Sequence, residues 1–278
     1  MHVFRTIDDL QAWRRRLEGD VGLVPTMGYL HEGHLSLVRE ARRQSAHAVA
    51  TIFVNPAQFA PHEDLGRYPR DEDRDLSLLE AERTDAVFVP TVDEMYPEGY
   101  ATYVGVDALT QRLEGASRPT HFRGVTTVVL KLFNIVRPDR AYFGQKDAQQ
   151  LAVIRRMVRD LDVPVHVVGL PIVREPDGLA MSSRNAYLTP EQRAQAPVLD
   201  RALALAERLF DDGVRDASQI RRHVEETIRA QPLAEIDYVS VADAETLDEL
   251  EIVDGAALVS LAVRFGATRL IDNTVLQP

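Results

Sequence analysis

The chain has 278 residues, of which 45% are hydrophobic, so it can fill the core of one large domain or two modest ones. Its formal net charge of −11 argues against an extended nucleic-acid surface, which depends on clustered positive charge. The absence of cysteine excludes disulfides, thiolate nucleophiles and Cys-ligated metals. No apolar stretch approaches the roughly 20 residues that span a bilayer, and the charged N-terminal segment is unlike a signal peptide. We therefore expect a cytoplasmic protein with neither a membrane nor a nucleic acid as partner.

Short β-rich runs alternate with segments of helical period in the first part of the chain. The predicted strands are 21–25, 48–54, 86–90, 141–144 and 165–173. The predicted helices between them are 35–46, 71–83, 124–136 and 147–161. This alternation is typical of a parallel sheet with right-handed crossovers, and the strands are too apolar to have one wet face. The predicted fold class is α/β, with a Rossmann-like parallel sheet flanked by helices over residues 1–174.

The pattern changes after a turn-rich connector at 174–189. Two predicted helices follow, at 190–211 and 217–230, and then three predicted strands at 236–241, 257–264 and 268–273. Helices followed by a run of strands indicate a smaller α+β domain over residues 175–278. We expect this domain to act as a lid, with the connector at its start.

The segment from Pro25 to His34 leaves a predicted strand, turns at glycine and enters a helix predicted to begin near His34. The positive end of a helix and glycines that allow close backbone approach favour a bound phosphate. The zinc signature H-E-x-x-H places its histidines four residues apart, whereas His31 and His34 are three apart with Gly33 between them. The alternative is a loop with two surface histidines.

Lys146 lies in a second cluster, Phe143–Asp147, after a short predicted strand and before a helix. It is one of only two lysines in a chain that otherwise uses arginine, the other being Lys131 in an apolar run. A flexible ammonium at the carboxyl edge of a sheet can meet a phosphate as a point charge. The alternative is a turn in which Asp147 caps the following helix. No GxxxxGK[ST] loop is present.

The connector contains the third cluster, Met181–Asn185, in which two hydroxyls, an arginine and adjacent amides could clamp an anion. A polar linker is the alternative. The acidic run at 70–75 is interpreted as the solvated start of a helix.

Neutral amides form the last group of candidates. Asn55 and Gln58 follow one predicted strand, and Gln150 opens the helix after Lys146, so the topology places all three near the carboxyl edge of the sheet. Such amides could orient a substrate carboxylate without pairing it so strongly that it loses nucleophilicity. Each could equally be an ordinary surface residue. The segment His121-Phe122-Arg123-Gly124 adds a further possible phosphate contact.

Six segments occur in the order and approximate spacing of the pantothenate synthetase (pantoate–β-alanine ligase) family, which the chain resembles over nearly its full length: VPTMGYLHEGH, FVNPAQF, RYPR, HFRGV, YFGQKD and GLAMSSRN. The family belongs to the nucleotidylyltransferase superfamily. In it, HxGH corresponds to the HIGH motif of class I aminoacyl-tRNA synthetases, and MSSRN is similar to their KMSKS loop. Ala57 and Asp71 depart from the residues usual in the family, without touching the core chemistry.

The resemblance implies an ATP-dependent ligase that condenses pantoate with β-alanine through pantoyl adenylate, releasing AMP and pyrophosphate. It implies catalytic roles for His34, often described as a proton donor, His31, Lys146, Ser182, Ser183 and Arg184. ATP would be bound by Met27, Gly28, Tyr29, Leu30, His31, Glu32, Gly33, His34, Gly144, Gln145, Lys146, Asp147, Val173, Met181, Ser182, Ser183 and Arg184. The substrates would be bound by Gln58, Gln150, Asn55 and Arg123. Mg²⁺ is expected on the ATP phosphates without a dedicated protein site, and the family implies a homodimer.

Two other functions compete with ligation. A nucleotidylyltransferase could use the same HxGH motif to transfer AMP or CMP to a phosphate-bearing substrate, which would call for more cationic groups near Gln58 and Gln150. A non-catalytic ATP- or RNA-binding module is disfavoured by the acidic charge and by the presence of all three clusters.

Overall fold

The structure is a computed structural model that describes residues 1–61 and 63–277. The chain divides into two compact units, the first comprising Met1–Gln145 and Gln150–Pro171 and the second Lys146–Gln149 and Ile172–Pro278. The sequence placed the boundary after residue 174 and Lys146 in the first domain. The tetrapeptide Lys146–Gln149 instead groups with the second unit, where its backbone is hydrogen-bonded to the last strand.

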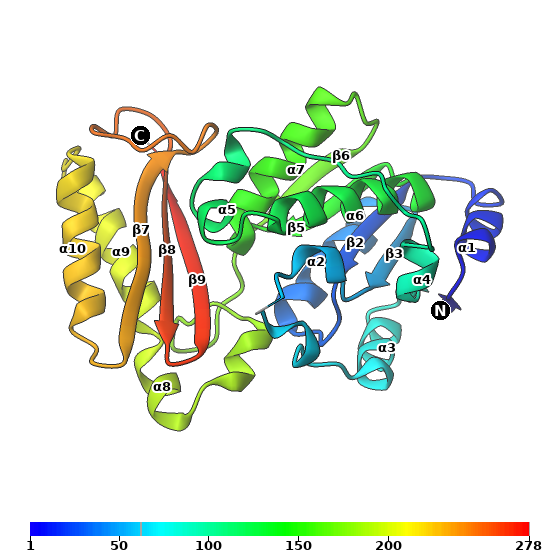
Figure 1. Cartoon of the computed structure of the whole chain (residues 1–278), viewed down its shortest axis with the longest axis horizontal. Helices are drawn as coiled ribbons and strands as arrows, with labels where there is room; N and C mark the ends of the chain where they lie inside the picture. Colours follow the sequence, from blue (N-terminus) through cyan, green and yellow to red (C-terminus); the bar gives the residue numbers. More distant parts are fainter. Residues whose placement is uncertain (62, 278) are drawn as a thin grey trace. The chain divides into compact units, whose positions relative to one another are not determined.

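A six-stranded parallel sheet forms the centre of the first unit, in the order β1-β4-β3-β2-β5-β6 (Figure 1). Its strands are β1 (His2–Phe4), β2 (Val21–Thr26), β3 (His47–Ile52), β4 (Ala86–Phe88), β5 (Arg140–Gly144) and β6 (His166–Leu170). Its α-helices are α1 (Ile7–Arg14), α2 (Glu32–Gln44), α3 (Glu72–Ala81), α4 (Val92–Met95), α5 (Glu114–Ser117), α6 (His121–Val136) and α7 (Ala148–Asp160). Short 3-10 turns of this unit are η1 (Pro56–Gln58), η2 (Asp64–Gly66) and η3 (Leu109–Gln111). A fourth, η4 (Gln145–Asp147), begins directly after β5 and contains Lys146 and Asp147 of the second unit. The predicted α/β fold class is confirmed.

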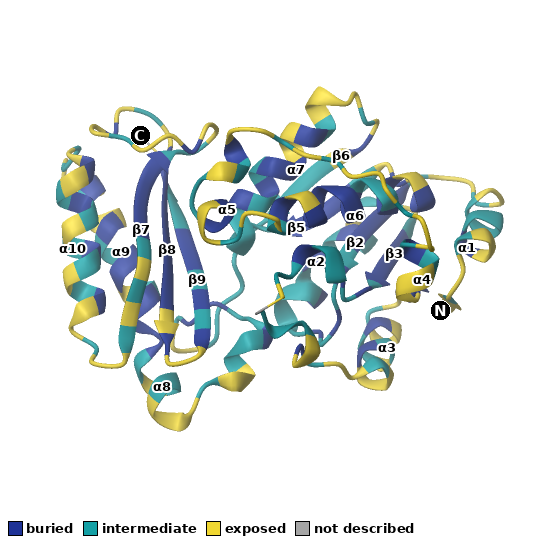
Figure 2. Cartoon of the chain, viewed as in Figure 1, coloured by how far each residue is buried: buried dark blue, intermediate teal, exposed yellow. Residues whose placement is uncertain are grey.

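Both faces of this sheet are buried, as the near-continuous apolar strands predicted. Successive residues of β2 alternate between two cores, Leu23 packing with α6 and α7 and Val24 packing with α2 and α3. The central strands are accordingly dark blue in Figure 2. Burial of such aliphatic side chains, at about 1.5–3 kcal/mol each, is the main source of the unit's stability.

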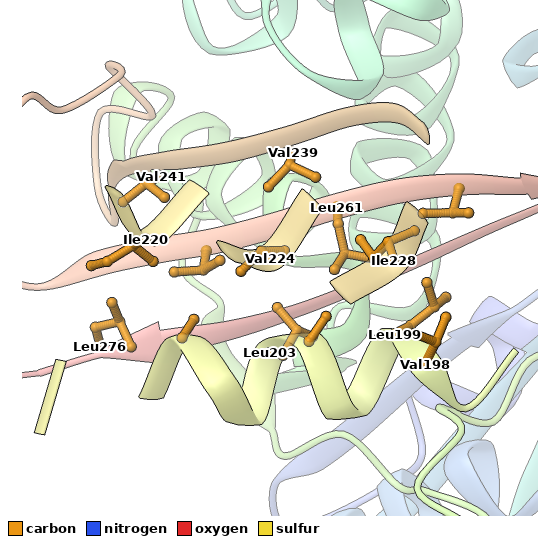
Figure 3. Close-up of a cluster of buried hydrophobic side chains, with 14 of the residues drawn as sticks. Val198, Leu199, Leu203, Ile220, Val224, Ile228, Val239, Val241, Leu261 and Leu276 are labelled. Carbon is orange, nitrogen blue, oxygen red and sulfur yellow. The ribbon is translucent and has the colours of Figure 1, made fainter. Parts of the chain in front are cut away.

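The second unit packs helices against one antiparallel sheet in the order β7-β8-β9. Its elements are η5 (Ser183–Tyr187), α8 (Pro190–Gln195), α9 (Val198–Asp211), α10 (Ala217–Arg229), β7 (Ala234–Asp243), β8 (Ala257–Phe265) and β9 (Thr268–Leu276). Every fourth residue of α10, namely Ile220, Val224 and Ile228, points into a core shared with α9 and the strands (Figure 3). The predicted smaller α+β domain is confirmed.

Several predicted boundaries are corrected. The helix predicted over 190–211 is two helices, α8 and α9, because Pro197 has no N–H with which to continue the hydrogen-bond ladder. The strands predicted at 86–90 and 165–173 end earlier, at Phe88 and Leu170. Strand β1 and helices α1, α4 and α5 were not predicted, because they are short and weakly periodic. In the described residues, no helix is both long and apolar enough to cross a membrane.

Candidate functional site

Strand order locates the candidate site of the first unit. From β2 the chain proceeds to β3 and β4 on one side, whereas β5 and β6 lie on the other side of β2. Ligands of open parallel sheets bind outside the carboxyl ends of the strands where the order reverses, which here are β2 and β5. The segment containing HEGH follows β2, and Gln145 follows β5.

The turn after β2 is held in an uncommon backbone conformation. Gly28 and Tyr29 both have positive φ, 80° and 52°, so the chain passes through two successive left-handed residues. The Thr26 hydroxyl accepts the Gly28 N–H at 3.1 Å, and Leu30 packs into the core. Met27, Gly28, Tyr29 and Leu30 therefore form one rigid turn before α2, and a side chain at Gly28 would be strained by its φ alone.

Asp75, in the first turn of α3, fixes this turn from the other side. Its Oδ2 accepts the Tyr29 N–H at 2.6 Å and its Oδ1 accepts the Leu30 N–H at 2.7 Å. The interpretation of residues 70–75 as a solvated helix start is thus wrong for Asp75, which is 1% exposed. Burial raises the pKa of Asp75, opposed by the two N–H donors, which favour the carboxylate.

The HEGH segment begins helix α2 at Glu32, two residues earlier than predicted, and His31 is the N-cap. The backbone N–H of His31 donates to Nδ1 of His34 at 3.3 Å, and the two imidazole rings lie 4.0 Å apart. Because Nδ1 of His34 accepts this bond, its neutral ring carries the proton on Nε2.

Gly33 has a steric reason to lie between the two histidines. A Cβ at this position would come within 2.9 Å of Cε1 and Nδ1 of His31. Any larger residue would push the His31 ring off the start of the helix. The side chain of Glu32 pairs with Arg39, which lowers the pKa of the Glu32 carboxyl through a hydrogen bond.

Gln58 lies after β3 in η1 and is 8% exposed. Its Oε1 accepts from Asn55 Nδ2 at 3.1 Å, and its Nε2 donates to Met27 Sδ at 3.0 Å. The carboxamide is thereby oriented on the rigid turn that follows β2. Two segments to which the resemblance gave different ligands, the turn to ATP and Gln58 to a substrate, are in direct contact.

Asn55 uses all its side-chain hydrogen-bonding groups inside the protein. Oδ1 accepts from the Ala57 N–H and the Tyr96 hydroxyl, and Nδ2 donates to Gln58 Oε1 and the Gly124 carbonyl. At 1% exposed, Asn55 has the contacts of a residue that orients Gln58. In this conformation no hydrogen-bonding group of the Asn55 side chain remains for the predicted direct contact with substrate.

The backbone of Gln58 is held by the segment that opens α6. His121 Nδ1 donates to the Gln58 carbonyl at 2.9 Å, and Arg118, paired with Glu63, reaches the same oxygen. Burial, helped by the Arg118 charge, lowers the pKa of His121 to about 4. Gly124 allows this approach, because a Cβ there would lie 2.3 Å from the Ala57 carbonyl oxygen.

The two remaining substrate candidates are less enclosed. Arg123 is exposed, and its guanidinium stacks over the Tyr103 ring at 3.9 Å. Gln150 lies in the first turn of α7, part-exposed. Neither residue is brought to Gln58 by a hydrogen bond between described residues.

The second unit holds Lys146. Gly144 ends β5, and Gln145, Lys146 and Asp147 form η4 before α7. The Lys146 carbonyl accepts from Asn273 Nδ2 at 2.9 Å, and its ammonium lies 3.9 Å from the Asp147 carboxylate. The Lys146 side chain is 19% exposed.

The connector of the second unit folds back on itself. The Met181 N–H donates to the Val173 carbonyl at 2.9 Å, so these two predicted ATP-binding residues are neighbours. Ser182 then caps η5 by accepting the Arg184 N–H at 3.3 Å, and Ser183 is buried. The MSSR segment is therefore ordered locally by its own hydroxyls.

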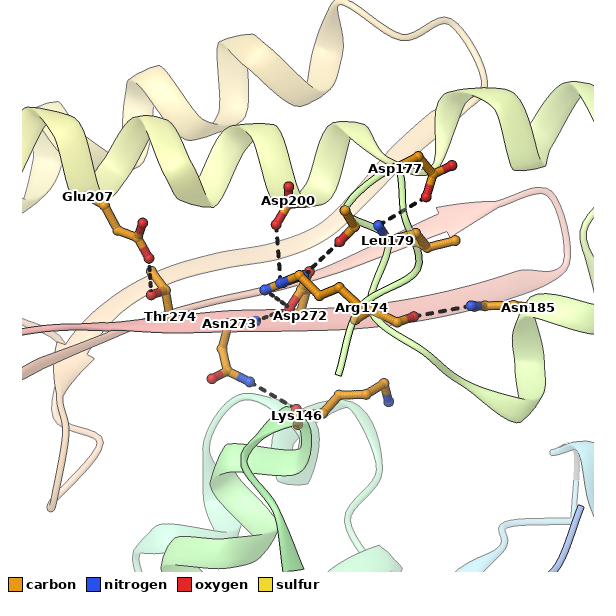
Figure 4. A network of polar contacts seen from close by, with 12 residues as sticks. Lys146, Arg174, Asp177, Leu179, Asn185, Asp200, Glu207, Asp272, Asn273 and Thr274 are labelled. Carbon is orange, nitrogen blue, oxygen red and sulfur yellow. Dashed lines mark hydrogen bonds and ion pairs between the residues drawn. The ribbon is translucent and has the colours of Figure 1, made fainter. Parts of the chain in front are cut away.

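A buried ion pair attaches this connector to β9. Arg174 makes a two-pronged contact with Asp272, at 2.7 and 3.1 Å, and its Nε lies 3.2 Å from Asp200 on α9 (Figure 4). Burial raises the pKa of Asp272, opposed by the Arg174 guanidinium. The backbone N–H of Asn273 also donates to Asp272 at 2.8 Å.

No group of three or more His, Asp or Glu side chains among the described residues has the arrangement of a metal site. Mg²⁺ that enters with a nucleotide needs no such cage, because phosphate oxygens and water fill most of its octahedral shell.

Sequence reasoning considered His121 only as part of a possible phosphate contact, and it missed Asp75, Asp272 and Asn273. Two of them carried a signal: Asp75 lies four residues before Leu79 on the buried face of α3, and Asp272 alternates with Leu270 on the buried face of β9. A carboxylate on a buried face predicts a specific partner. The partners themselves, Tyr29 and Leu30 amides and Arg174, are distant in sequence and left no local pattern.

The family model described as pantoate-beta-alanine ligase matches residues 2–275. The chain is 61% identical over 277 residues to the pantothenate synthetase of Roseiflexus sp. (strain RS-1), covering all of both chains. It is 56% identical over 280 residues to that of Acetivibrio thermocellus, again covering both chains fully.

Solved structures agree with these relatives. The structure resembles the crystal structure of pantothenate synthetase from Thermus thermophilus, with a TM-score of 0.96, 52% identity and full coverage of both chains. A pantoate-beta-alanine ligase from Francisella tularensis, solved in complex with beta-gamma ATP and beta-alanine, has a TM-score of 0.83 and 31% identity, covering 99% of this chain and 97% of that one.

Proposed function

Because the chain belongs to the pantoate–β-alanine ligase family, an enzyme family of pantothenate biosynthesis, we propose that it joins pantoate to β-alanine in two steps. In the first, a carboxylate oxygen of pantoate attacks the α-phosphorus of ATP, and the bond to the bridging oxygen of pyrophosphate breaks. In the second, the amine of β-alanine attacks the acyl carbon of pantoyl adenylate, AMP leaves, and the nitrogen loses a proton. The Francisella relative, solved in complex with beta-gamma ATP and beta-alanine, supports ATP and β-alanine as the ligands.

The contact between Gln58 and Met27 carries this proposal. If the turn after β2 binds ATP and Gln58 binds pantoate, the acceptor and the nucleotide would lie side by side, and the 3.0 Å contact between Gln58 Nε2 and Met27 Sδ supports this. Such placement is what carboxylate attack on a phosphate requires, since no enzyme nucleophile takes part. Gln150 supplies a second amide for pantoate. A neutral amide suits an acceptor carboxylate, whereas a phosphate-bearing acceptor would call for cations.

Charge that builds on the phosphates in the transition state is met by fixed donors. His34 offers Nε2–H because its Nδ1 accepts from the backbone, and His31 caps the same helix. Lys146 and the segment Ser182–Arg184 would supply the remaining donors from the second unit. Donors that are oriented beforehand stabilise such charge without reorganising during the reaction.

The nucleotide would be held by main chain as much as by side chains. Met27 to Gly33 provide the rigid turn and the first helical amides of α2, which have no carbonyl partner within the helix. Gly144, Gln145, Asp147, Val173 and Met181 complete the proposed ATP site. Arg123 and Asn55 support the substrates from α6 and η1, Asn55 through Gln58. Mg²⁺ would enter with the ATP phosphates and neutralise part of their charge.

Exchange of labelled pyrophosphate into ATP, with and without pantoate, tests the first step. We expect exchange only with pantoate, and AMP release on adding β-alanine. His34→Ala should lower the exchange rate on the order of 100-fold or more, because one oriented donor is lost. Exchange that is independent of pantoate would contradict the proposal.

A matched control is His47→Ala, a histidine of the same unit whose Nε2 contacts the Glu18 carbonyl. This variant should exchange pyrophosphate at the wild-type rate. Equal rates for His34→Ala and wild type would remove His34 from the mechanism. The cytoplasmic location and the homodimer stay predictions. Sedimentation analysis of the purified chain would test the homodimer.

A further inference from the structure

Asn273 contacts Lys146 from the far end of the sequence. We propose that Asn273 is a positioning residue, which holds the Lys146 backbone so that the ammonium reaches the ATP phosphates. The inference rests on the proposed function, in which Lys146 contacts those phosphates. It adds a residue of the last strand, with no motif around it, to the machinery of the adenylation step.

The contact is specific and enclosed. Asn273 is 3% exposed on β9, and its Nδ2 donates to the Lys146 carbonyl at 2.9 Å (Figure 4). The residues on either side of this carbonyl form η4, a single 3-10 turn between β5 and α7. One turn of this kind has few hydrogen bonds of its own, so an outside donor determines where it lies.

Asn273 is itself fixed by its surroundings. Its backbone N–H donates to Asp272 Oδ1, and Asp272 is held by the two-pronged contact with Arg174. In the antiparallel ladder Asn273 also faces Ser260 of β8. The carboxamide therefore projects from a rigid strand.

The backbone position of a lysine sets the region that its ammonium can reach. Its ammonium is a point charge on a stem of four methylene groups, so the backbone beneath it sets which part of a ligand it reaches. A displacement of about 1 Å in a positioning group can cost roughly 100-fold in rate. The same strand anchors the connector through Arg174, so β9 supports both proposed phosphate-binding segments of the second unit.

The kinetic test compares Asn273→Ala with Thr274→Ala. Thr274 is the next residue of β9 and loses a hydrogen bond to Glu207, which does not involve Lys146. We expect Asn273→Ala to lower the rate constant of pantoate-dependent exchange by about tenfold or more, and Thr274→Ala to leave it unchanged. If Asn273→Ala does not fold, Asn273→Ser replaces it, because the shorter hydroxyl cannot span the distance to the Lys146 carbonyl.

A double-mutant cycle separates positioning from a general structural effect. In a Lys146→Ala background, Asn273→Ala should cause no further loss of rate if Asn273 acts through Lys146. If the rate of the double variant fell by the product of the two single-variant losses, the inference would be overturned. If Lys146→Ala alone exchanges pyrophosphate at the wild-type rate, the proposed role of Lys146 is wrong, which is a different outcome from a failure of the inference about Asn273.

The two lysines of the chain allow a readout that does not depend on catalysis. Reductive methylation with ¹³C-formaldehyde labels Lys131, Lys146 and the terminal amine, and keeps their positive charge. In the wild type, ATP should shift the Lys146 signal and leave Lys131 as an internal reference. In Asn273→Ala the free Lys146 signal should move and its shift with saturating ATP should shrink. Signals identical to those of Thr274→Ala would overturn the inference.

Discussion

His121 is uncharged at neutral pH because its ring is enclosed beside the Arg118 guanidinium. Its Nδ1 donates to the Gln58 carbonyl, so the neutral tautomer with the proton on Nδ1 is the one that the fold requires. Glu63 and Glu114 favour the charged form, but burial outweighs them and lowers the pKa to about 4. The histidine is therefore a structural hydrogen-bond donor for the Gln58 backbone.

This state predicts a pH dependence of stability. In the unfolded chain His121 has a pKa of about 6.5, so between about pH 6.5 and pH 4 the unfolded state binds the additional proton. The stability that neutral His121 contributes to the folded state is complete above pH 6.5 and is lost as the pH falls toward 4. At 1.36 kcal/mol per pKa unit, the full loss is about 3 kcal/mol.

Urea unfolding at pH 7 and pH 4.5 measures this loss. His121→Asn keeps a donor near the Nδ1 position and cannot titrate in this range. We expect a smaller loss of unfolding free energy on acidification in the variant than in the wild type. If the unfolding free energy of the two proteins had the same pH dependence, the pKa of His121 would not be lowered in the native state.

Helix α3 is hydrogen-bonded to the turn after β2 through a single carboxylate, that of Asp75. Asp75 accepts from the two consecutive amides of the turn after β2, and this contact joins the start of α3 to the carboxyl end of the strand. Hydrogen bonds to a charged acceptor contribute about 1.5–3 kcal/mol. The element thus sets the conformation from which His31 and His34 project.

Asp75→Asn replaces one acceptor oxygen by a donor that faces an N–H. We expect a loss of about 1–3 kcal/mol in unfolding free energy, and a fall in pantoate-dependent exchange at temperatures where the variant is fully folded. Asp73→Asn is the control, since Asp73 is exposed in the same helical turn and carries the same charge toward the helix dipole. Equal effects of the two substitutions would assign the result to the charge and not to the turn.

Helices and strands were predicted from the sequence where their hydrophobic pattern extends over many residues. The buried face of α10 and the apolar strands β2 and β3 follow directly from residue spacing. The break between α8 and α9 was missed although Pro197 marks it, because the apolar pattern continues on both sides. The helix start at Glu32 was missed because histidine is a weak capping residue in single-sequence rules.

At the scale of the whole molecule, each unit has its own hydrophobic core. A core of this size can support independent folding. The buried pair of Arg174 and Asp272 belongs to the second unit, where removal of one partner leaves a charge largely enclosed. The sole tryptophan, Trp13, packs on a core of the first unit.

Asp272→Asn should therefore destabilise the second unit by about 3 kcal/mol, because breaking a buried pair leaves Arg174 with Asp200 alone. Circular dichroism in urea should show an earlier transition. Trp13 fluorescence should keep its wild-type midpoint, because it reports on the first unit. A joint shift of both signals would show that the two units unfold together.

The sequence by itself determined the fold class, the succession of elements and the segments that we propose to carry the chemistry. These properties depend on local periodicity, turn residues and short motifs such as HEGH and GQKD, which are encoded within a few residues. Only the tertiary structure decided how each candidate is held: Gln58 by Asn55 and Met27, the turn after β2 by Asp75, and Lys146 by Asn273. The physical reason is that a buried polar group takes its partner from any part of the chain that packing brings close, and sequence spacing holds no record of that approach.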